Sequence, residues 1–231
     1  MCIDKKSCLF RFVFSGMILL LFLLLTVQLL CFDVAPLGPL GSEIGFSTCN
    51  VAVRDIIGVN EICDDISGVF GILALVSIPV FAGIGIFQWI KRKRLFAVDR
   101  DLWILLAIYV LALSFYGLFE VVIINYRPIL EDGALAASYP SSHTLLSVVF
   151  FGTAFIQARI RIGAKPIRIT AEVLLVLFTL ISVVTRLLSG VHWLTDILGG
   201  VLLGLFLLSL YHALLGIAMT SIAEREQNDD K

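Results

Sequence analysis

The sequence has few charged residues. They make up 15% of the 231 residues, whereas hydrophobic residues make up 59%. A soluble globular domain carries roughly 25% charged residues. With a net charge of −1, nothing in the sequence suggests nucleic-acid binding, and the shortage of charge excludes a soluble domain. Together with a mean hydropathy of +1.02, it predicts a polytopic membrane protein.

Cysteine and histidine are also scarce, with five and three residues. Cys2 and Cys8 precede the first apolar stretch, Cys31 ends it, and Cys49 and Cys63 lie in the longest polar connection. Their spacing matches no zinc motif, so no metal or cofactor is predicted. Cys49 and Cys63 are interpreted either as a disulfide that closes this connection or as two free thiols.

Long apolar stretches recur six times along the chain. A helix needs about 20 such residues to cross a hydrocarbon core about 30 Å thick. The predicted fold class is therefore all-α, a polytopic membrane protein with a bundle of six transmembrane helices, whose short connections make consecutive helices antiparallel. The first stretch is too long for a cleaved signal peptide and is expected to remain as an anchor. The stretches lie at residues 11–32, 69–90, 102–124, 141–158, 170–188 and 195–217.

The basic residues predict the orientation, because Lys and Arg accumulate in cytoplasmic loops. With both termini in the cytoplasm, only Arg54, Arg127 and Arg186 fall on the outer side. The compact size and basic inner loops are typical of a bacterial cell-membrane protein. Three regions are expected: an anchor helix and extracytoplasmic loop, a transmembrane bundle, and a polar cytoplasmic tail. Their bounds are 1–68, 69–217 and 218–231.

Three polar segments interrupt the apolar chain: FEVVIINYRP at 119–128, SYPSSHT at 138–144 and TRLLSGVHWLTD at 185–196. Taken singly, their residues have ordinary structural explanations, such as a snorkelling cation for Arg127 and an interfacial aromatic for Trp193. The predicted topology, however, brings all three segments to the outer face. One site would then hold two arginines, two histidines, an aspartate and a pair of serines.

This set of side chains suits an anionic phosphoryl group. The guanidinium groups of Arg127 and Arg186 present fixed forks that bind phosphate oxygens and stabilise the charge of a five-coordinate transition state. Backbone N–H groups at the start of the fourth span, after Pro140, favour anions. The hydroxyls of Ser141 and Ser142 add further donors.

The histidines and the aspartate suggest covalent catalysis. His192 and Asp196 lie four residues apart, and a carboxylate beside a neutral histidine fixes its tautomer and stabilises the imidazolium. His192 is therefore the candidate nucleophile. His143 is the candidate general acid that protonates the leaving oxygen. Chemistry of this kind requires no metal.

Arg-Pro, then Pro-Ser-x-His, then Arg-x5-His-x3-Asp, in this order and at the outer ends of a six-span bundle, resembles the type 2 phosphatidic acid phosphatase superfamily of integral-membrane lipid phosphatases. The resemblance covers roughly residues 69–217. It implies that His192 forms a phosphohistidine, that His143 protonates the departing lipid alcohol, and that Asp196 orients His192. The phosphate-binding residues that it implies are Arg127, Arg186 and Ser141.

Three positions depart from the family pattern. Glu120 stands where the family has a lysine, seven residues before Arg127, and a carboxylate there repels phosphate unless it is protonated or paired with Arg127. Ser142 replaces a glycine, which the start of a helix tolerates. Thr185 replaces a serine and keeps its hydroxyl.

The sequence therefore predicts a lipid phosphatase that cleaves a phosphate monoester or a pyrophosphate at the outer face, with the bilayer and its lipid phosphate as partners. The resemblance suggests undecaprenyl pyrophosphate, phosphatidic acid or phosphatidylglycerophosphate as substrates. Two alternatives stay open. The first is a lipid phosphotransferase, and the second is a catalytically weakened member that binds or transports phospholipid because Glu120 replaces the lysine.

Overall fold

A computed structural model describes the backbone of residues 5–229 and the side chains of residues 6–218. Cys2 and the last two residues of the predicted tail lie outside the described residues. Within this range the chain is helical and forms no β-sheet, only isolated bridges. The elements are α1 (Lys5–Cys31), η1 (Pro39–Gly41), α2 (Ser47–Ile57), α3 (Glu61–Leu75), α4 (Ser77–Arg92), η2 (Leu95–Ala97), α5 (Arg100–Val121), α6 (Ser142–Arg161), α7 (Lys165–Leu188) and α8 (Leu194–Asp229).

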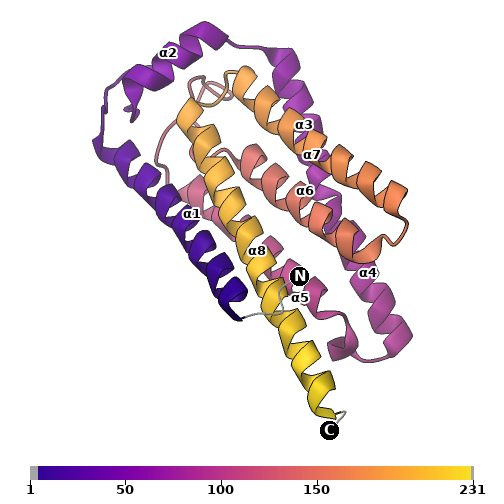
Figure 1. Cartoon of the computed structure of the whole chain (residues 1–231). Helices are drawn as coiled ribbons and strands as arrows, with labels where there is room; N and C mark the ends of the chain where they lie inside the picture. The colour runs from indigo at the N-terminus through magenta and orange to yellow at the C-terminus, as the bar shows by residue number, and fades with distance from the viewer. Residues whose placement is uncertain (1–4, 230–231) are drawn as a thin grey trace.

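Six segments are long and apolar enough to cross a membrane, which confirms the predicted bundle (Figure 1). The second span is built from two helices, α3 and α4, which meet at Val76. It begins at Glu61 rather than at residue 69, because Asn60 caps α3 by accepting a hydrogen bond from the backbone N–H of Cys63 at 3.1 Å. The first two turns of α3 are polar, and hydropathy alone does not reveal them.

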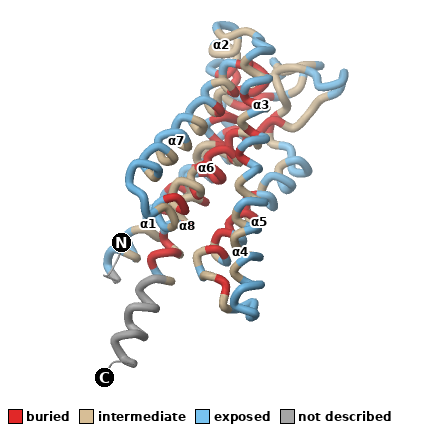
Figure 2. The backbone as a smooth tube through the Cα atoms, turned by 90° about the vertical axis from the view of Figure 1, so that its right-hand side faces the viewer, coloured by how far each residue is buried: buried red, intermediate tan, exposed pale blue. Residues whose placement is uncertain are grey.

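Helix α6 lies at the centre of the bundle, packed against α3, α7 and α8. Figure 2 shows the buried residues gathered along α6 and α8 and at the end of the bundle near α3. Glycines let α8 approach α6 closely, as small residues do in membrane helices. A Cβ atom at Gly204 would lie 2.8 Å from the side chain of Val148, and one at Gly200 would lie 2.7 Å from the carbonyl oxygen of Ser141.

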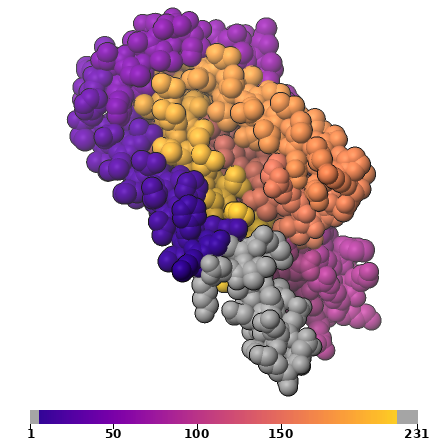
Figure 3. Space-filling view, in the orientation of Figure 1, coloured from indigo at the N-terminus to yellow at the C-terminus, as the bar shows by residue number. Residues whose placement is uncertain are grey.

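Helix α1 covers the side of α8 that faces away from α7 (Figure 3). Above it, the loop after α1 leads into α2, which lies across the end of the bundle (Figure 1). Asn50 fixes α2 there by bonding both the backbone N–H and the hydroxyl of Thr195 on α8. Cys49 and Cys63 in this region are both free thiols, so the disulfide alternative is wrong for this structure.

Candidate active site

The three polar segments predicted from the sequence meet at one end of the bundle. Arg127 and Ser138 come from the connection between α5 and α6, and Arg186 from the last turn of α7. His192 lies in the connection before α8, and Asp196 lies in the first turn of α8. Four of these five residues are buried: the side chains of Arg186, His192 and Asp196 are 4%, 1% and 0% exposed, and Ser138 is 3% exposed.

His192 and Asp196 are connected through a residue that the sequence did not single out. The Nδ1 atom of His192 lies 3.6 Å from Oδ2 of Asp196, which is too long for a hydrogen bond. The hydroxyl of Ser138 lies between them, 3.0 Å from Nδ1 of His192, and donates a hydrogen bond to Oδ2 of Asp196. The predicted orientation of His192 by Asp196 is thus indirect, because His192 stands before the first residue of α8 rather than on the helix.

The hydrogen bonds define the tautomer of His192. A guanidinium only donates, and Nη2 of Arg186 lies 3.0 Å from Nε2 of His192, so Nε2 is the acceptor. The proton then sits on Nδ1, and this N–H donates a hydrogen bond to the hydroxyl of Ser138. Burial, together with the positive charges of Arg186 and Arg127, holds the pKa of His192 well below its usual range. His192 is therefore neutral, with a lone pair on Nε2.

Arg186 is held by a helix outside the predicted motifs. Its Nη1 atom lies 2.5 Å from a carboxylate oxygen of Asp64 and 3.3 Å from the hydroxyl of Ser67, both on α3. Its Nε atom has no partner within the described residues. Asp64 was missed because the span was expected to begin after it. Recognition of Asn60 as a helix cap would have placed this carboxylate on the helix.

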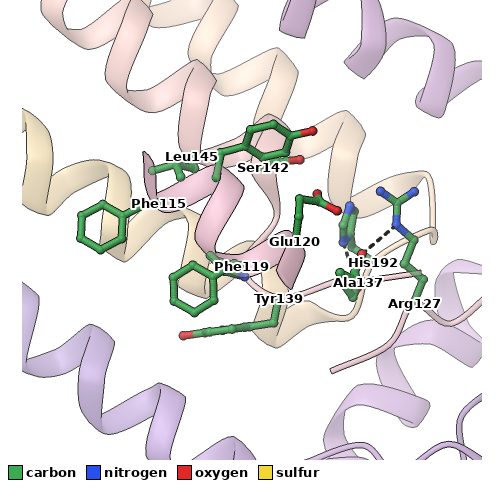
Figure 4. A pocket seen from close by; sticks show the side chains of 12 residues that line it. Phe115, Phe119, Glu120, Arg127, Ala137, Tyr139, Ser142, Leu145 and His192 are labelled. Carbon is green, nitrogen blue, oxygen red and sulfur yellow. Dashed lines mark hydrogen bonds between the residues drawn. The ribbon is translucent and has the colours of Figure 1, made fainter. Parts of the chain in front are cut away.

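Arg127 lies in a loop and lines a pocket together with His192. Its Nε atom donates to the carbonyl oxygen of Ala137 at 3.2 Å, and its Nη1 atom pairs with Glu131 at 3.2 Å. The pairing of Arg127 with Glu120 that the sequence suggested is not formed, because α5 ends at Val121 and the chain leaves the helical path before Arg127. Glu120 nevertheless lines the pocket together with Arg127 and His192 (Figure 4).

The pocket has a polar side and an apolar side. Phe115, Phe119 and Leu145 form the apolar wall, apart from the side chains of Arg127 and His192 (Figure 4). The free volume is only about 10 Å³, which is room for about one water molecule. The guanidinium of Arg186 occupies Nε2 of His192, so another group reaches this atom only when the guanidinium moves aside.

Of the two predicted serines and the second histidine, only one residue lines the pocket. Ser142 lines the pocket. Ser141 is buried and caps α6, with its hydroxyl 3.5 Å from the backbone N–H of Thr144. His143 is absent from the pocket lining and packs against Gly71 of α3, where a Cβ atom would lie 2.7 Å from its ring. The Nδ1 atom of His143 is buried and has no partner within the described residues.

The chain resembles known proteins in sequence and in fold. The family model of the PAP2 superfamily matches residues 101–219. The crystal structure of a transmembrane PAP2-type phosphatidylglycerolphosphate phosphatase from Bacillus subtilis is similar with a TM-score of 0.63, over 87% of this chain and 94% of that chain. At 17% identity this likeness shows the fold. No curated protein sequence matches the chain.

If Arg186 binds phosphate, as the sequence predicts, Asp64 competes with that phosphate for the same guanidinium. The substitution Asp64→Asn keeps a hydrogen-bond acceptor beside Arg186 and removes the charge. We expect it to tighten the binding of inorganic phosphate about fivefold to tenfold, equivalent to about 1 kcal/mol. Isothermal titration calorimetry of the detergent-solubilised protein measures this. Asp65→Asn is the matched control, since Asp65 is exposed. Weaker phosphate binding in Asp64→Asn would mean that the charge of Asp64 is needed to position Arg186.

Proposed function

This chain belongs to the PAP2 superfamily, and from that premise we propose that it is an integral-membrane lipid phosphatase with His192 as its nucleophile. The observation that carries the proposal is the state of His192. The ring is buried and neutral, its Nδ1–H is directed through Ser138 to Asp196, and its Nε2 lone pair faces the guanidinium of Arg186. A nucleophile oriented by a partner in this way is the arrangement that covalent catalysis requires.

In the first step, Nε2 of His192 attacks the phosphorus atom while the bond from phosphorus to the lipid oxygen breaks. The imidazolium that forms keeps its Nδ1 proton, and the buried carboxylate of Asp196 stabilises its charge through Ser138. The guanidinium groups of Arg186 and Arg127 bind the phosphoryl oxygens and stabilise the charge of the transition state.

His143 completes the proposed reaction as the general acid. It protonates the lipid oxygen that leaves and then takes a proton from the water that attacks the phosphohistidine. Water releases inorganic phosphate and restores neutral His192. His143 lies in the first turn of α6, and its Nδ1 atom has no partner within the described residues. The unoccupied Nδ1 atom supports the assignment, since a histidine with a purely structural role has its buried nitrogens bonded.

The substrate is proposed to be a lipid with a terminal phosphate or pyrophosphate. The apolar wall formed by Phe115, Phe119 and Leu145 supports this, because it puts apolar side chains in the same pocket as Arg127 and His192. Undecaprenyl pyrophosphate, phosphatidic acid and phosphatidylglycerophosphate are the proposed candidates. Both termini are proposed to lie in the cytoplasm and the site on the outer side of the membrane, as the distribution of basic residues predicts.

Glu120 favours a second candidate function. Its carboxylate lines the phosphate pocket and pairs with no described cation, so it weakens the attraction of the two arginines for an anionic group. A member of the family with weakened hydrolysis that binds phospholipid, or passes phosphate to another alcohol, is the alternative.

The nucleophile is tested by His192→Ala. We expect the variant to lose essentially all phosphate release, by a factor on the order of 10⁴ or more, because no other group replaces the covalent step. Phosphate release from the three candidate lipids in detergent, with EDTA present, measures the effect. An unchanged melting temperature shows that the variant is folded. Near-normal turnover in folded His192→Ala would disprove the assignment.

The bridging role of Ser138 is tested by Ser138→Ala, which leaves Nδ1 of His192 without its acceptor. We expect turnover to fall about 10-fold to 100-fold, as for other losses of an orienting partner. Ser138→Thr keeps a hydroxyl and should recover part of that loss. Ser114→Ala, on an exposed face of α5, is the control. Equal activity of Ser138→Ala and the unmodified protein would show that Asp196 orients His192 without Ser138.

The position that departs from the family is tested by Glu120→Lys. The added charge attracts the phosphoryl group, so we expect the Michaelis constant for a lipid phosphate to fall about tenfold, with the salt dependence typical of a charge effect. Glu43→Lys makes the same change of charge on the exposed loop between α1 and α2. If Glu120→Lys instead lost turnover while Glu43→Lys did not, the carboxylate of Glu120 would be required by the reaction.

A further inference from the structure

A second, larger cavity lies at the end of the protein that is opposite the active site. It is a groove of about 390 Å³ between α4 and α5, within the range of about 300–1,000 Å³ typical of ligand sites. The helices are consecutive in the chain, and their connection, with η2, closes one end of the groove. Figure 1 shows this end of α4 and α5 far from α2, which covers the active-site end.

The groove is apolar and open in its middle. Its walls carry Ala82, Gly85 and Trp89 from α4, and Leu102, Trp103 and Val110 from α5. A Cβ atom at Gly85 would touch Leu102 only at 3.9 Å and Val98 only at 4.0 Å, so no side chain fills the space in front of it. Figure 2 shows α4 as a largely exposed helix. Within the bilayer such a surface is covered by hydrocarbon.

The length of the groove matches one leaflet of the membrane. Its α4 wall runs from Ile78 to Trp89, which is about 16 Å at 1.5 Å per residue. The hydrocarbon core of a bilayer is about 30 Å thick, so the groove spans about half of it. Phe96, in η2 at the closed end, is 93% exposed, as expected of an aromatic side chain at the membrane interface.

The closed end of the groove carries unpaired positive charge. Lys91, Lys93 and Arg94 are exposed, and no carboxylate among the described residues pairs with them. The nearby acidic residue Asp99 is already used, because it pairs with Arg92 at 2.7 Å and with Arg161 at 3.4 Å. Basic residues beside a membrane surface attract anionic lipids.

We propose that the groove between α4 and α5 binds one acyl chain of an anionic phospholipid, whose headgroup pairs with Lys91, Lys93 and Arg94. This lipid belongs to the leaflet opposite the active site and is not a substrate, because no residue of the active-site pocket lines the groove. The proposal is therefore independent of the proposed function. A second copy of the chain is a poorer occupant, because a symmetric contact at this groove brings the same cations together.

Tryptophan fluorescence tests the proposal directly. Trp89 and Trp103 line the groove, and the third tryptophan, Trp193, is only 3% exposed. The protein is reconstituted into phosphatidylcholine vesicles that contain a minor fraction of phosphatidylglycerol with brominated chains, and bromine quenches a tryptophan that it contacts. We expect a relative binding constant about tenfold above that of brominated phosphatidylcholine, lowered by high salt.

Two pairs of variants separate the groove from the general lipid surface. Gly85→Leu places a side chain in the groove and should abolish the preference for the anionic lipid. Gly83→Leu is the matched control, since Gly83 is exposed and a Cβ atom there meets nothing within 4 Å. Replacing Lys91, Lys93 and Arg94 together by Gln should also abolish the preference, whereas Arg100→Gln should not.

Three results would overturn the proposal. The first is quenching by both brominated lipids in proportion to their abundance. The second is an equal effect of Gly85→Leu and Gly83→Leu on the preference for phosphatidylglycerol. The third is a dimer in which Trp89 and Trp103 are shielded from both lipids and which Gly85→Leu dissociates, because a second copy of the chain would then occupy the groove.

Discussion

The buried charge of Arg186 is the constraint on which the rest of the site depends. A guanidinium stays protonated in proteins, and the side chain of Arg186 is only 4% exposed. Burying such a charge without partners is costly. The chain supplies Asp64 on one side of the fork and Nε2 of His192 on the other. Helix α3 must therefore pack against α7, although its polar start precedes the region matched by the family model.

The packing of α3 against α7 also fixes the connection between α7 and α8, which carries His192. The turn before α3 lies so close to the connection after α7 that a Cβ atom at Gly190 would be 1.9 Å from the carbonyl oxygen of Gly58, and Gly190 has a φ of +67°. The backbone N–H of Asn60 donates to the carbonyl oxygen of Ser189 at 3.0 Å. These contacts hold the segment that carries His192 against the start of α3, so that His192 and Arg186 keep their relative positions.

The two ends of the bundle use polar groups differently. At the end that carries His192, Nε of Arg186 and Nδ1 of His143 are buried and have no partner among the described residues, so this end keeps unsatisfied polar groups. At the opposite end, Arg161 pairs with Asp99 and Asp101 and bonds Gln157, which ties α5 to α6 with its partners satisfied. Helix α4 lies next to this network, and an apolar groove runs between α4 and α5.

Much of the architecture could be predicted from the sequence, because the length and hydropathy of a membrane span are local properties, and the spacing of Arg186, His192 and Asp196 is short. The positions of the six spans and the family were predicted in this way. The partners of those residues could not be. Ser138 lies 54 residues from His192 and Asp64 lies 122 residues from Arg186, and only the packing of α3, α7 and α8 brings them together. The tertiary structure alone decided that Ser138 bridges His192 and Asp196, that Glu131 rather than Glu120 pairs with Arg127, and that α4 and α5 leave a groove between them. Each of these depends on how the helices and their connections meet.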